Sequence, residues 1–575
     1  MIGIPWRCFR RRAVDSQSIE YALPDAPRHD WKLMNAHHDA AASNPLRRFN
    51  LVGLVLLTLL VLAPLVIDLH PHDAGAEAAL ETAAAEAANP DAPMPTIDEE
   101  AAIEDRAEAL ADPASPGEDG HGDSHAHGHG HGAGHDVPPL WQLGTVPFVL
   151  LLLAIAVLPL VRTTMHWWES NTNRLAVALG LAALTLLHYT VFDSWTAALL
   201  AVEHAIPGEY VPFIMLLFSL YVISGGISIT GDLKATPTVN TSFILVGTLI
   251  ASFIGTTGAS MLLIRPLLET NKERKYRVHT VVFFIFLVSN IGGTLLPIGD
   301  PPLFLGYLKG VPFTWTLMLW KEWAFMAAIL LVVYWIWDRI LVAREAPIDL
   351  ARDETERRPL RLRGAINLLL LVGVVFAVAL LDPSKPIPGT DWHAFPFMRE
   401  LVMLGLAGAS LALTPAGVRE SNRFNYHAIA EVAALFVGIF ITMQVPLAVL
   451  KANGADLGLE TPGQFYWLTG ILSSFLDNAP TYLVFFQTAE SLTTEAGDGV
   501  LTLAGGEFIR QDLLIGISLG AVFMGANTYI GNGPNFMVKS IAEQEGVRMP
   551  SFFGYMFYSV LVLVPCFVLV HILFL

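Results

Sequence analysis

The chain has 575 residues, of which 53% are hydrophobic and 15% are charged, and its mean hydropathy is +0.51. A soluble protein of this size carries about a quarter charged residues, so the composition excludes an ordinary soluble globular protein. Many apolar runs reach the roughly 20 residues that a helix needs to span hydrocarbon. The net charge of −18 says little about a nucleic-acid partner, because the acidic residues are concentrated in one segment. Cys8 and Cys566 are the only cysteines, and their separation argues against a disulfide framework or a thiolate metal site. We therefore predict an all-α polytopic membrane protein.

The first 137 residues are predicted to precede the main helical region. Residues 1–46 form a polar tail whose basic N-terminus is not followed directly by an apolar run, so no cleavable signal peptide is expected. Residues 47–69 are predicted to be an extra transmembrane helix, which Arg47 and Arg48 orient with its N-terminus in the cytoplasm. Residues 70–137 then form an acidic, Ala-rich and His-rich linker, expected to be disordered on the outer, periplasmic side.

Histidines crowd the end of this linker, in the stretch H-G-D-S-H-A-H-G-H-G-H-G-A-G-H. Imidazoles at this density can bind zinc, nickel or copper, which makes the segment a candidate metal-sensing or metal-scavenging arm. The alternative is a flexible linker that binds metal incidentally, since the glycine spacing gives no fixed geometry. The candidate metal ligands are His121, His125, His127, His129, His131 and His135.

Residues 138–343 are predicted to form the first of two repeats. Its spans are expected near 140–161, 174–192, 212–230, 278–308 and 315–340, with a re-entrant hairpin at 240–268. Residues 193–208 are apolar but short and contain Glu203, His204 and Pro207, so they are predicted to be an interfacial or re-entrant piece.

An arginine-rich segment, 344–363, is predicted to be a cytoplasmic connection and the seam between the halves. Residues 364–575 are predicted to form the second repeat. Its spans are expected near 364–381, 399–414, 429–450, 511–541 and 552–575, with a hairpin at 462–488.

One stretch in the first repeat, S-N-I-G-G-T-L-L-P-I-G-D-P-P at 289–302, interrupts an apolar run with prolines, glycines, an Asn and an Asp. Non-helical backbone at membrane depth survives only where protein buries it or where it lines a cavity. We therefore predict a broken helix whose freed carbonyls, Asn290 and Asp300 are available to a cation.

The two halves match each other by eye. S-F-I-G-T-T-G-A-S at 252–260 matches S-F-L-D-N-A-P-T at 474–481, and I-G-D-P-P-L-F at 298–304 matches I-G-N-G-P-N-F at 530–536. The first hairpin exits to a basic loop and the second to an acidic one, as opposite membrane orientations require. The pattern predicts an inverted repeat with two re-entrant hairpins and two broken helices, the architecture of a secondary transporter.

Oxygen ligands for a hard cation such as sodium are available at these breaks. Two carboxylates stand out, Asp300 and Asp477, one in each half. Burial disfavours an ionised carboxylate, so sodium and protons could compete for it, although either Asp could instead cap a half-helix. The candidate ion- or substrate-binding residues are Thr256, Thr257, Ser260, Asn290, Thr294, Asp300, Asp477, Asn478, Thr481, Asn527, Thr528, Asn532 and Asn535.

The stretch at 289–302 resembles the S-N-I-G-G-x-x-x-x-I-G-D-P-P signature of NhaD-type sodium/proton antiporters and their relatives in the ion transporter superfamily. L-D-N-A-P-T at 476–481 resembles the Asp-Asn hairpin of the same group. The opening of the core, L-P-L-V-R-T-T-M-H-W-W-E-S-N with L-L-F-S-L-Y-V-I-S-G-G-I-S-I at 216–229, is similar to a subgroup labelled citrate transport or sodium/proton antiporter. The resemblance covers about 140–575. It implies a scaffold domain and a moving transport domain, commonly in a homodimer, with Asn290, Asp300, Asp477, Asn478 and Asn527 as ion-site positions.

This sequence also departs from the group. The first hairpin has G-T-T-G where antiporter relatives tend to have Asp-Asn, and the Ser-Asn-Thr tips of the dicarboxylate branch are absent from both hairpins. These departures count against a dicarboxylate substrate.

Three functions follow as hypotheses. The first is a sodium/proton antiporter of a bacterial inner membrane, with Na⁺ and H⁺ as transported ions, the lipid bilayer and a second copy as partners, and no other cofactor. The second is a cation-coupled citrate or dicarboxylate symporter, for which Arg265 and Lys309 are the nearest basic residues. The third is a metal-linked transporter that uses the His-rich arm. No enzyme is expected, since no nucleotide loop, nucleophile motif or fixed metal-ligand set is present in the sequence.

Overall fold

The computed structural model describes residues 137–355, 357–383, 385–387 and 390–575. The predicted helix at 47–69 and the His-rich arm lie outside the described residues. Within them the chain is mostly helical, and six helices are long and apolar enough to cross a membrane, or seven if one bent pair counts as a span. This agrees with the predicted all-α multi-pass membrane protein.

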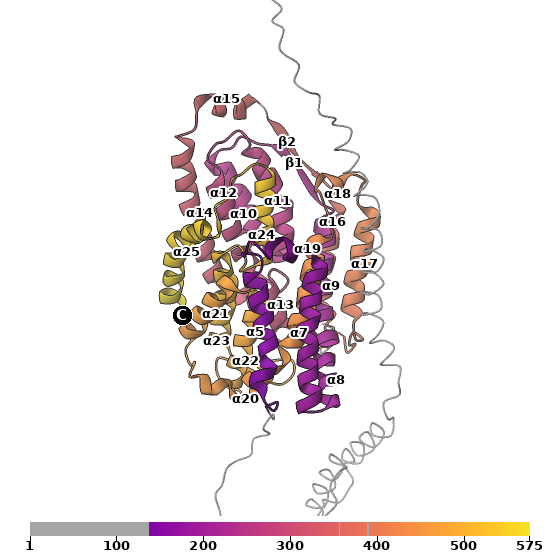
Figure 1. Cartoon of the computed structure of the whole chain (residues 1–575). Helices are drawn as coiled ribbons and strands as arrows, with labels where there is room; N and C mark the ends of the chain where they lie inside the picture. Colours follow the sequence, from indigo (N-terminus) through magenta and orange to yellow (C-terminus); the bar gives the residue numbers. More distant parts are fainter. Residues whose placement is uncertain (1–136, 356, 384, 388–389) are drawn as a thin grey trace, which may run out of the picture. The chain divides into compact units, whose positions relative to one another are not determined.

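The described chain begins with α5 (Trp141–Val157), the short α6 (Met165–Trp168) and α7 (Asn171–Phe192). Helix α7 packs against α5 and, far along the chain, against α19 (His427–Thr442). Arg174 on α7 forms an ion pair of 2.9 Å with Glu431 on α19. This ion pair therefore joins the first helices of the described chain to a helix of the second half (Figure 1).

The prediction for residues 193–208 is wrong. Helix α8 (Trp195–Glu203), a π-helical segment η1 (His204–Tyr210) and α9 (Val211–Ser224) form one continuous span of 30 residues. Pro207 lies inside the π-helical turn, where the wider backbone tolerates a residue that would break an α-helix. The predicted span at 212–230 is accordingly only the second half of this long helix.

The first predicted hairpin consists of α10 (Pro237–Ile254) and α11 (Thr256–Thr270), which pack against each other. Gly255 joins them with φ +77°, a left-handed conformation that favours glycine. The predicted broken helix follows as α12 (Val278–Leu287), η2 (Ile291–Leu295) and α13 (Pro301–Leu308).

The segment that closes the first half and connects to the second includes a small sheet. Its helices are η3 (Trp315–Leu319), α14 (Trp320–Val342) and α15 (Pro347–Thr355). Strand β2 (Arg358–Arg363) then pairs antiparallel with β1 (Ser228–Asp232), with Ser228 opposite Arg363. The predicted connection at 344–363 is thus partly a strand with its side chains exposed.

The second half contains the same order of a hairpin and a broken helix. Helices α21 (Pro462–Phe475) and α22 (Asn478–Ser491) form the hairpin, and α23 (Gln511–Met524), η5 (Gly525–Asn527) and α24 (Gly533–Gln544) form the broken helix. The other elements of this half are α16 (Ile366–Leu380), α17 (Met398–Leu413), α18 (Val418–Ser421), α20 (Gln444–Asn453), η4 (Gly454–Leu457), β3 (Val500–Thr502), β4 (Phe508–Arg510) and α25 (Phe552–Phe574).

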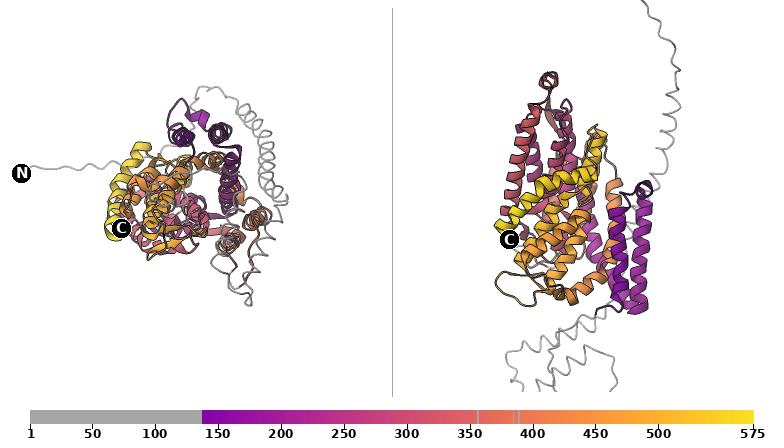
Figure 2. Two further views of the ribbon diagram at one scale, coloured as in Figure 1. Left: turned by 90° about the horizontal axis from the view of Figure 1, so that it is seen from below. Right: turned by 60° about the vertical axis from the view of Figure 1, so that its left-hand side comes forward.

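The paired elements lie toward opposite ends of the described helical unit. Figure 1 places α10, α11 and α12 in its upper part and α21, α22 and α23 in its lower part, and Figure 2 shows the same separation after rotation. All residues of α12 except Val278 are buried, as is most of α23, so the first legs of the two broken helices form the centre of the packing. The opposite orientation of the two halves in a bilayer stays a prediction.

Candidate ion site

The four chain breaks meet at the carboxylate of Asp300, which is 1% exposed. Thr256, at the tip of the first hairpin, donates a hydrogen bond of 3.0 Å to Oδ1. Asn532, in the second broken helix, donates one of 2.9 Å to the same oxygen. Asn478, at the tip of the second hairpin, donates one of 2.7 Å to Oδ2. Asp300 therefore connects its own broken helix with the other three interrupted elements.

In each broken helix, two glycines allow the backbone to approach itself closely at the break. A Cβ added to Gly299 would lie 2.2 Å from the carbonyl oxygen of Gly293, and one added to Gly531 would lie 2.5 Å from that of Gly525. Real Cβ atoms do not approach this closely, so a larger residue at either position would force the break open. The same spacing of six residues occurs in both halves.

A serine in each hairpin forms hydrogen bonds with the adjacent broken helix. Ser252 donates to the carbonyl of Gly292 at 2.6 Å and accepts from the N–H of Leu295 at 3.0 Å. Ser474 donates to the carbonyl of Met524 at 3.1 Å and accepts from the side chain of Asn527 at 2.9 Å. Breaking a helix frees backbone groups that must be satisfied, and these hydroxyls satisfy some of them.

Asparagine amides satisfy other groups at the breaks. Asn535 donates to the carbonyls of Gly525 and Thr528, both at 2.9 Å, and its Oδ1 accepts from Asn290 at 2.7 Å. Asn290 also donates to the carbonyl of Ile285 at 2.8 Å. These contacts join the two broken helices directly to each other.

The hydroxyl residues predicted for the site mostly make local contacts. Thr294 donates to Ile291, Thr481 to Asp477 and Thr528 to Ser474, each to a backbone carbonyl at 2.6–2.9 Å. Ser260 and Ser289 share a hydrogen bond of 2.8 Å. Thr257 is half-buried beside Thr256. Of these residues only Thr256 reaches Asp300 directly.

Asp477 lies in a different environment from Asp300. It is half-buried, and its Oδ1 accepts the N–H of Ala479 at 3.1 Å, which makes it the N-cap of α22. This is the structural arrangement that the sequence left open for one of the two carboxylates. A cap uses one carboxylate oxygen, so the contact does not occupy the whole group.

The site offers further oxygen atoms that could accept a cation. Among the described residues, the buried Oδ1 atoms of Asn478 and Asn527 have no hydrogen-bond partner. Buried polar atoms without partners are rare in folded proteins. Asn478 contacts Asp300 and Asn527 contacts Ser474 of the second hairpin, so both amides belong to the interrupted elements that meet at Asp300.

Helix ends shape the electrostatics of the site. Helices α11, α13, α22 and α24 all begin at the breaks, directly after or at residues of this cluster. Their N-termini carry partial positive charge, which stabilises negative charge near Asp300. No Lys or Arg appears among the hydrogen-bond partners of Asp300 within the described residues.

The basic residues suggested by the sequence are engaged elsewhere. Lys309 forms an ion pair with Glu209, and Arg265 forms one of 3.0 Å with Glu545. The His-rich arm lies outside the described residues, within which no group of three His, Cys, Asp or Glu side chains could hold a metal.

Sequence reasoning missed the role of Ser252 and Ser474. Both begin the matched strings of the two hairpins, S-F-I-G and S-F-L-D. Their shared position was a usable signal, because a serine that recurs beside a helix break can satisfy the carbonyls that the break frees.

Buried, interrupted helices that meet at one carboxylate inside a bundle of membrane-spanning helices define a membrane transporter. A family model described as "Putative citrate transport" matches residues 136–575. The chain belongs to this family. None of the curated proteins compared with it matches.

Proposed function

We propose that the protein is a sodium/proton antiporter in which Na⁺ and H⁺ compete for Asp300. The observation that carries this proposal is the convergence of Thr256, Asn478 and Asn532 on one buried carboxylate. Intramembrane ionisable groups are functional by default. The resemblance of the stretch at 289–302 to sodium/proton antiporters supports the same assignment.

The chemistry follows from the burial of this charge. A buried carboxylate is costly to keep ionised, and either a proton or a sodium ion removes that cost. Binding one therefore displaces the other. Asp300 would bind the ion together with the unpartnered oxygens of Asn478 and Asn527.

Alternating access needs the site to open to one side at a time. Each hairpin reaches the site from a different end of the described unit (Figure 1), so movement of one hairpin would expose Asp300 to one compartment only. In this proposal Asp477, at the tip of the second hairpin, would guide an ion toward Asp300.

The test uses purified protein in liposomes that contain a pH dye. Sodium or lithium added outside should drive proton efflux, while potassium and citrate should not. Proteoliposomes that carry Asp300→Asn are the matched control for leak. Proton movement that requires citrate and ignores sodium would overturn the proposal.

A second candidate is cation-coupled citrate symport, which two observations favour. The family carries citrate in its description, and four helices begin at the breaks around Asp300, where their N-termini would favour an anion. Two carboxylates near the site and the engagement of Lys309 and Arg265 in ion pairs count against it. Sodium-dependent uptake of labelled citrate that competing citrate saturates would establish this alternative.

A further inference from the structure

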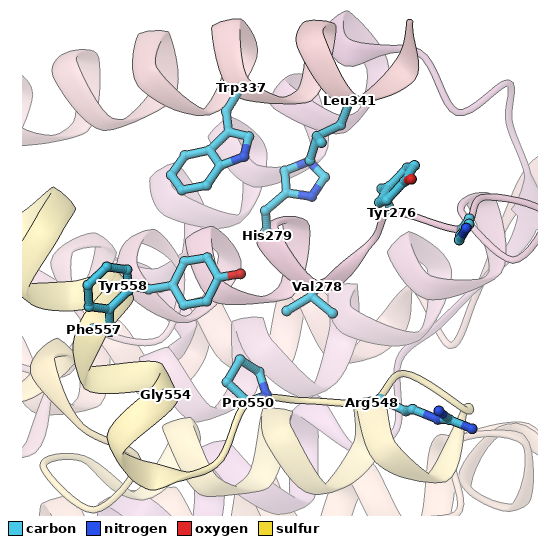
Figure 3. A pocket seen from close by; sticks show the side chains of 11 residues that line it. Tyr276, Val278, His279, Trp337, Leu341, Arg548, Pro550, Gly554, Phe557 and Tyr558 are labelled. Atoms are coloured by element: carbon cyan, nitrogen blue, oxygen red, sulfur yellow. The ribbon is translucent and has the colours of Figure 1, made fainter. Parts of the chain in front are cut away.

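A pocket of about 640 Å³ lies away from Asp300, between the ends of α12, α14 and α25. Figure 3 shows Trp337 and Leu341 of α14 on one side, and Pro550, Phe557 and Tyr558 on the other. Two basic side chains, Lys275 and Arg548, line it, and His279 lies in its inner wall. No acidic residue is among those that line it.

We expect the pocket to lie at the depth of lipid headgroups. Its residues lie close to the ends of candidate spans: α14 ends at Val342, α12 begins at Val278, and α25 begins at Phe552. Tryptophan and tyrosine concentrate at this depth in membrane proteins, and Tyr276, Trp337 and Tyr558 line the pocket.

The two basic side chains are available to a ligand. Within the described residues neither Lys275 nor Arg548 takes part in an ion pair, whereas the nearby Lys272 and Arg274 do. Lys275 Nζ lies only over the ring of Tyr276, 5.4 Å from its centroid. The neighbouring Glu345 faces inward, where its carboxylate accepts the backbone N–H groups of Lys275 and Tyr276 at 3.2 and 2.9 Å.

The walls continue into apolar surface. Phe553, Phe557 and Val560 on α25 are exposed, as are Ile336 and Ile340 on α14. An occupant therefore meets positive charge at the pocket and hydrocarbon along the helices beside it. A phospholipid has this combination in one molecule, while a free phosphate would use only the charged part.

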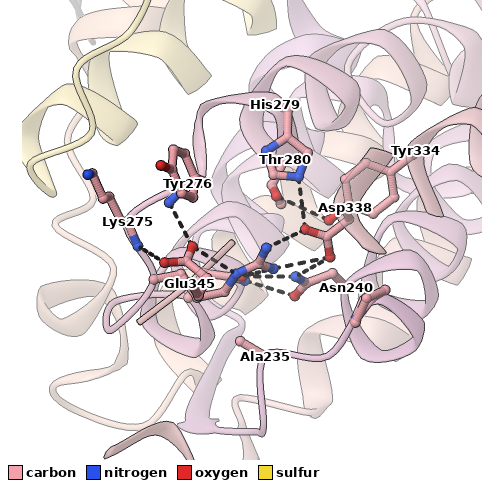
Figure 4. A network of polar contacts seen from close by, with 12 residues as sticks. Ala235, Asn240, Lys275, Tyr276, His279, Thr280, Tyr334, Asp338 and Glu345 are labelled. Atoms are coloured by element: carbon pink, nitrogen blue, oxygen red, sulfur yellow. Dashed lines mark hydrogen bonds and ion pairs between the residues drawn. The ribbon is translucent and has the colours of Figure 1, made fainter. Parts of the chain in front are cut away.

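The inner wall of the pocket is part of a buried polar network (Figure 4). His279 contacts Asp338 at 2.8 Å, Arg274 forms an ion pair with Asp338 at 2.6 Å, and Asn240 donates to Asp338 at 3.2 Å. The network joins α10, α12 and α14. A headgroup in the pocket would therefore lie against the first leg of the broken helix that leads to Asn290 and Asp300.

We propose that this pocket binds one anionic phospholipid, with its phosphate between Lys275 and Arg548 and its acyl chains along α14 and α25. The basic loops place this end on the cytoplasmic side by the positive-inside rule, where anionic lipids concentrate and basic pockets between helices recognise their headgroups. The proposal does not depend on which ion the protein transports.

The experiment measures lipid retention by native mass spectrometry. Full-length protein is purified, exposed to equal amounts of phosphatidylglycerol and phosphatidylcholine, and ionised from detergent. Wild type should retain one phosphatidylglycerol in preference to phosphatidylcholine. The Lys275→Ala, Arg548→Ala double variant should bind it about tenfold more weakly, since each basic side chain near an anionic headgroup strengthens binding several-fold.

Two further variants distinguish the effect of charge inside the pocket from the effect of the overall charge of the protein. Arg162→Ala with Lys321→Ala removes the same charge from exposed positions outside the pocket and should leave retention unchanged. Lys275→Arg with Arg548→Lys keeps the charge and should retain the lipid. Equal retention of the two lipids by wild type, or equal retention of phosphatidylglycerol by wild type and the Ala double variant, would overturn the proposal. Loss of retention upon addition of inorganic phosphate at equal concentration would also overturn it, because a free anion would then be the preferred occupant.

Discussion

Asn532 donates a hydrogen bond of 2.9 Å to Asp300, and the two residues hold matching positions in the I-G-N-G-P and I-G-D-P-P strings of the two halves. An acid in both positions would place two carboxylates in contact, which cannot both ionise. An amide in both would remove the charge. The sequence difference at this one matched pair therefore gives the centre of the fold a single carboxylate and a donor for it.

Replacing the acid by its amide tests this arrangement. Asp300→Asn should reduce sodium-driven proton movement at least about tenfold, equivalent to ~1.4 kcal/mol, because the site loses its titrating group. Proton fluxes in liposomes measure the effect. The double variant Asp300→Asn, Asn532→Asp is the control, since it returns one acid and one amide to the pair and should recover part of the thermal stability lost in the single variant. Full activity of Asp300→Asn would refute carboxylate competition.

Two substitutions of Asp477 should distinguish a structural role of this residue from a role in transport. Asp477→Asn keeps a side chain that caps helices well, so folding should be preserved, whereas Asp477→Ala should destabilise the protein by about 1 kcal/mol. If Asp477 also guides the ion, Asp477→Asn should raise the sodium concentration for half-maximal flux about tenfold, an effect of ~1.4 kcal/mol. Thermal melting and sodium titrations on the same samples distinguish the two roles. An unchanged titration in Asp477→Asn would restrict this residue to capping.

The breaks in the helices were predictable from composition, while the contacts between them were not. Prolines, paired glycines and an acid inside an apolar run have few interpretations at membrane depth, and the structure interrupts the helix at Ile291–Leu295 as expected. The partners of Asp300 come from residues 44, 178 and 232 positions away. The polar residues could be identified from the sequence, but the contacts among them could not be predicted.

The long helix from Trp195 to Ser224 shows the opposite case. Glu203, His204 and Pro207 resemble a helix end, and the local sequence gives no reason for the helix to continue. In the structure a π-helical turn accommodates the proline, and Glu209 is neutralised by Lys309, which lies a hundred residues away. Strand β2 was missed for a related reason: its exposed arginines resemble a loop, and its partner β1 lies in another segment.

The glycine pairs should be intolerant of a methyl group. Gly299→Ala and Gly531→Ala place a Cβ 2.2 and 2.5 Å from backbone carbonyl oxygens, and overpacking of this kind costs roughly 1–3 kcal/mol or more. Both variants should lower the melting temperature in detergent and reduce the monodisperse fraction in size-exclusion chromatography. Gly533→Ala is the matched control in the same break, because nothing lies within 4 Å of its added Cβ. Equal melting of all three variants would contradict the close backbone approach.

The buried ion pair beneath the lipid pocket should stabilise the packing of α10, α12 and α14. Asp338 is 0% exposed and contacts Arg274, His279 and Asn240. Removing its charge leaves the buried Arg274 guanidinium with only the more distant carboxylate of Glu345, at 3.7 Å, as a counter-ion. Breaking a buried ion pair costs up to about 3–5 kcal/mol. Asp338→Asn should therefore lower the melting temperature markedly.

An exposed ion pair at the same end provides the comparison. Lys234 contacts Glu354 at 2.7 Å, and this hydrogen bond lowers the pKa of the Glu354 carboxyl. Solvent screens such pairs almost completely, so Glu354→Gln should have the same melting temperature as the wild type. Calorimetric or fluorescence melting of the two variants side by side gives the answer. If Asp338→Asn and Glu354→Gln had the same melting temperature, the network would contribute no stability. The junction of the three helices would then depend on apolar packing alone.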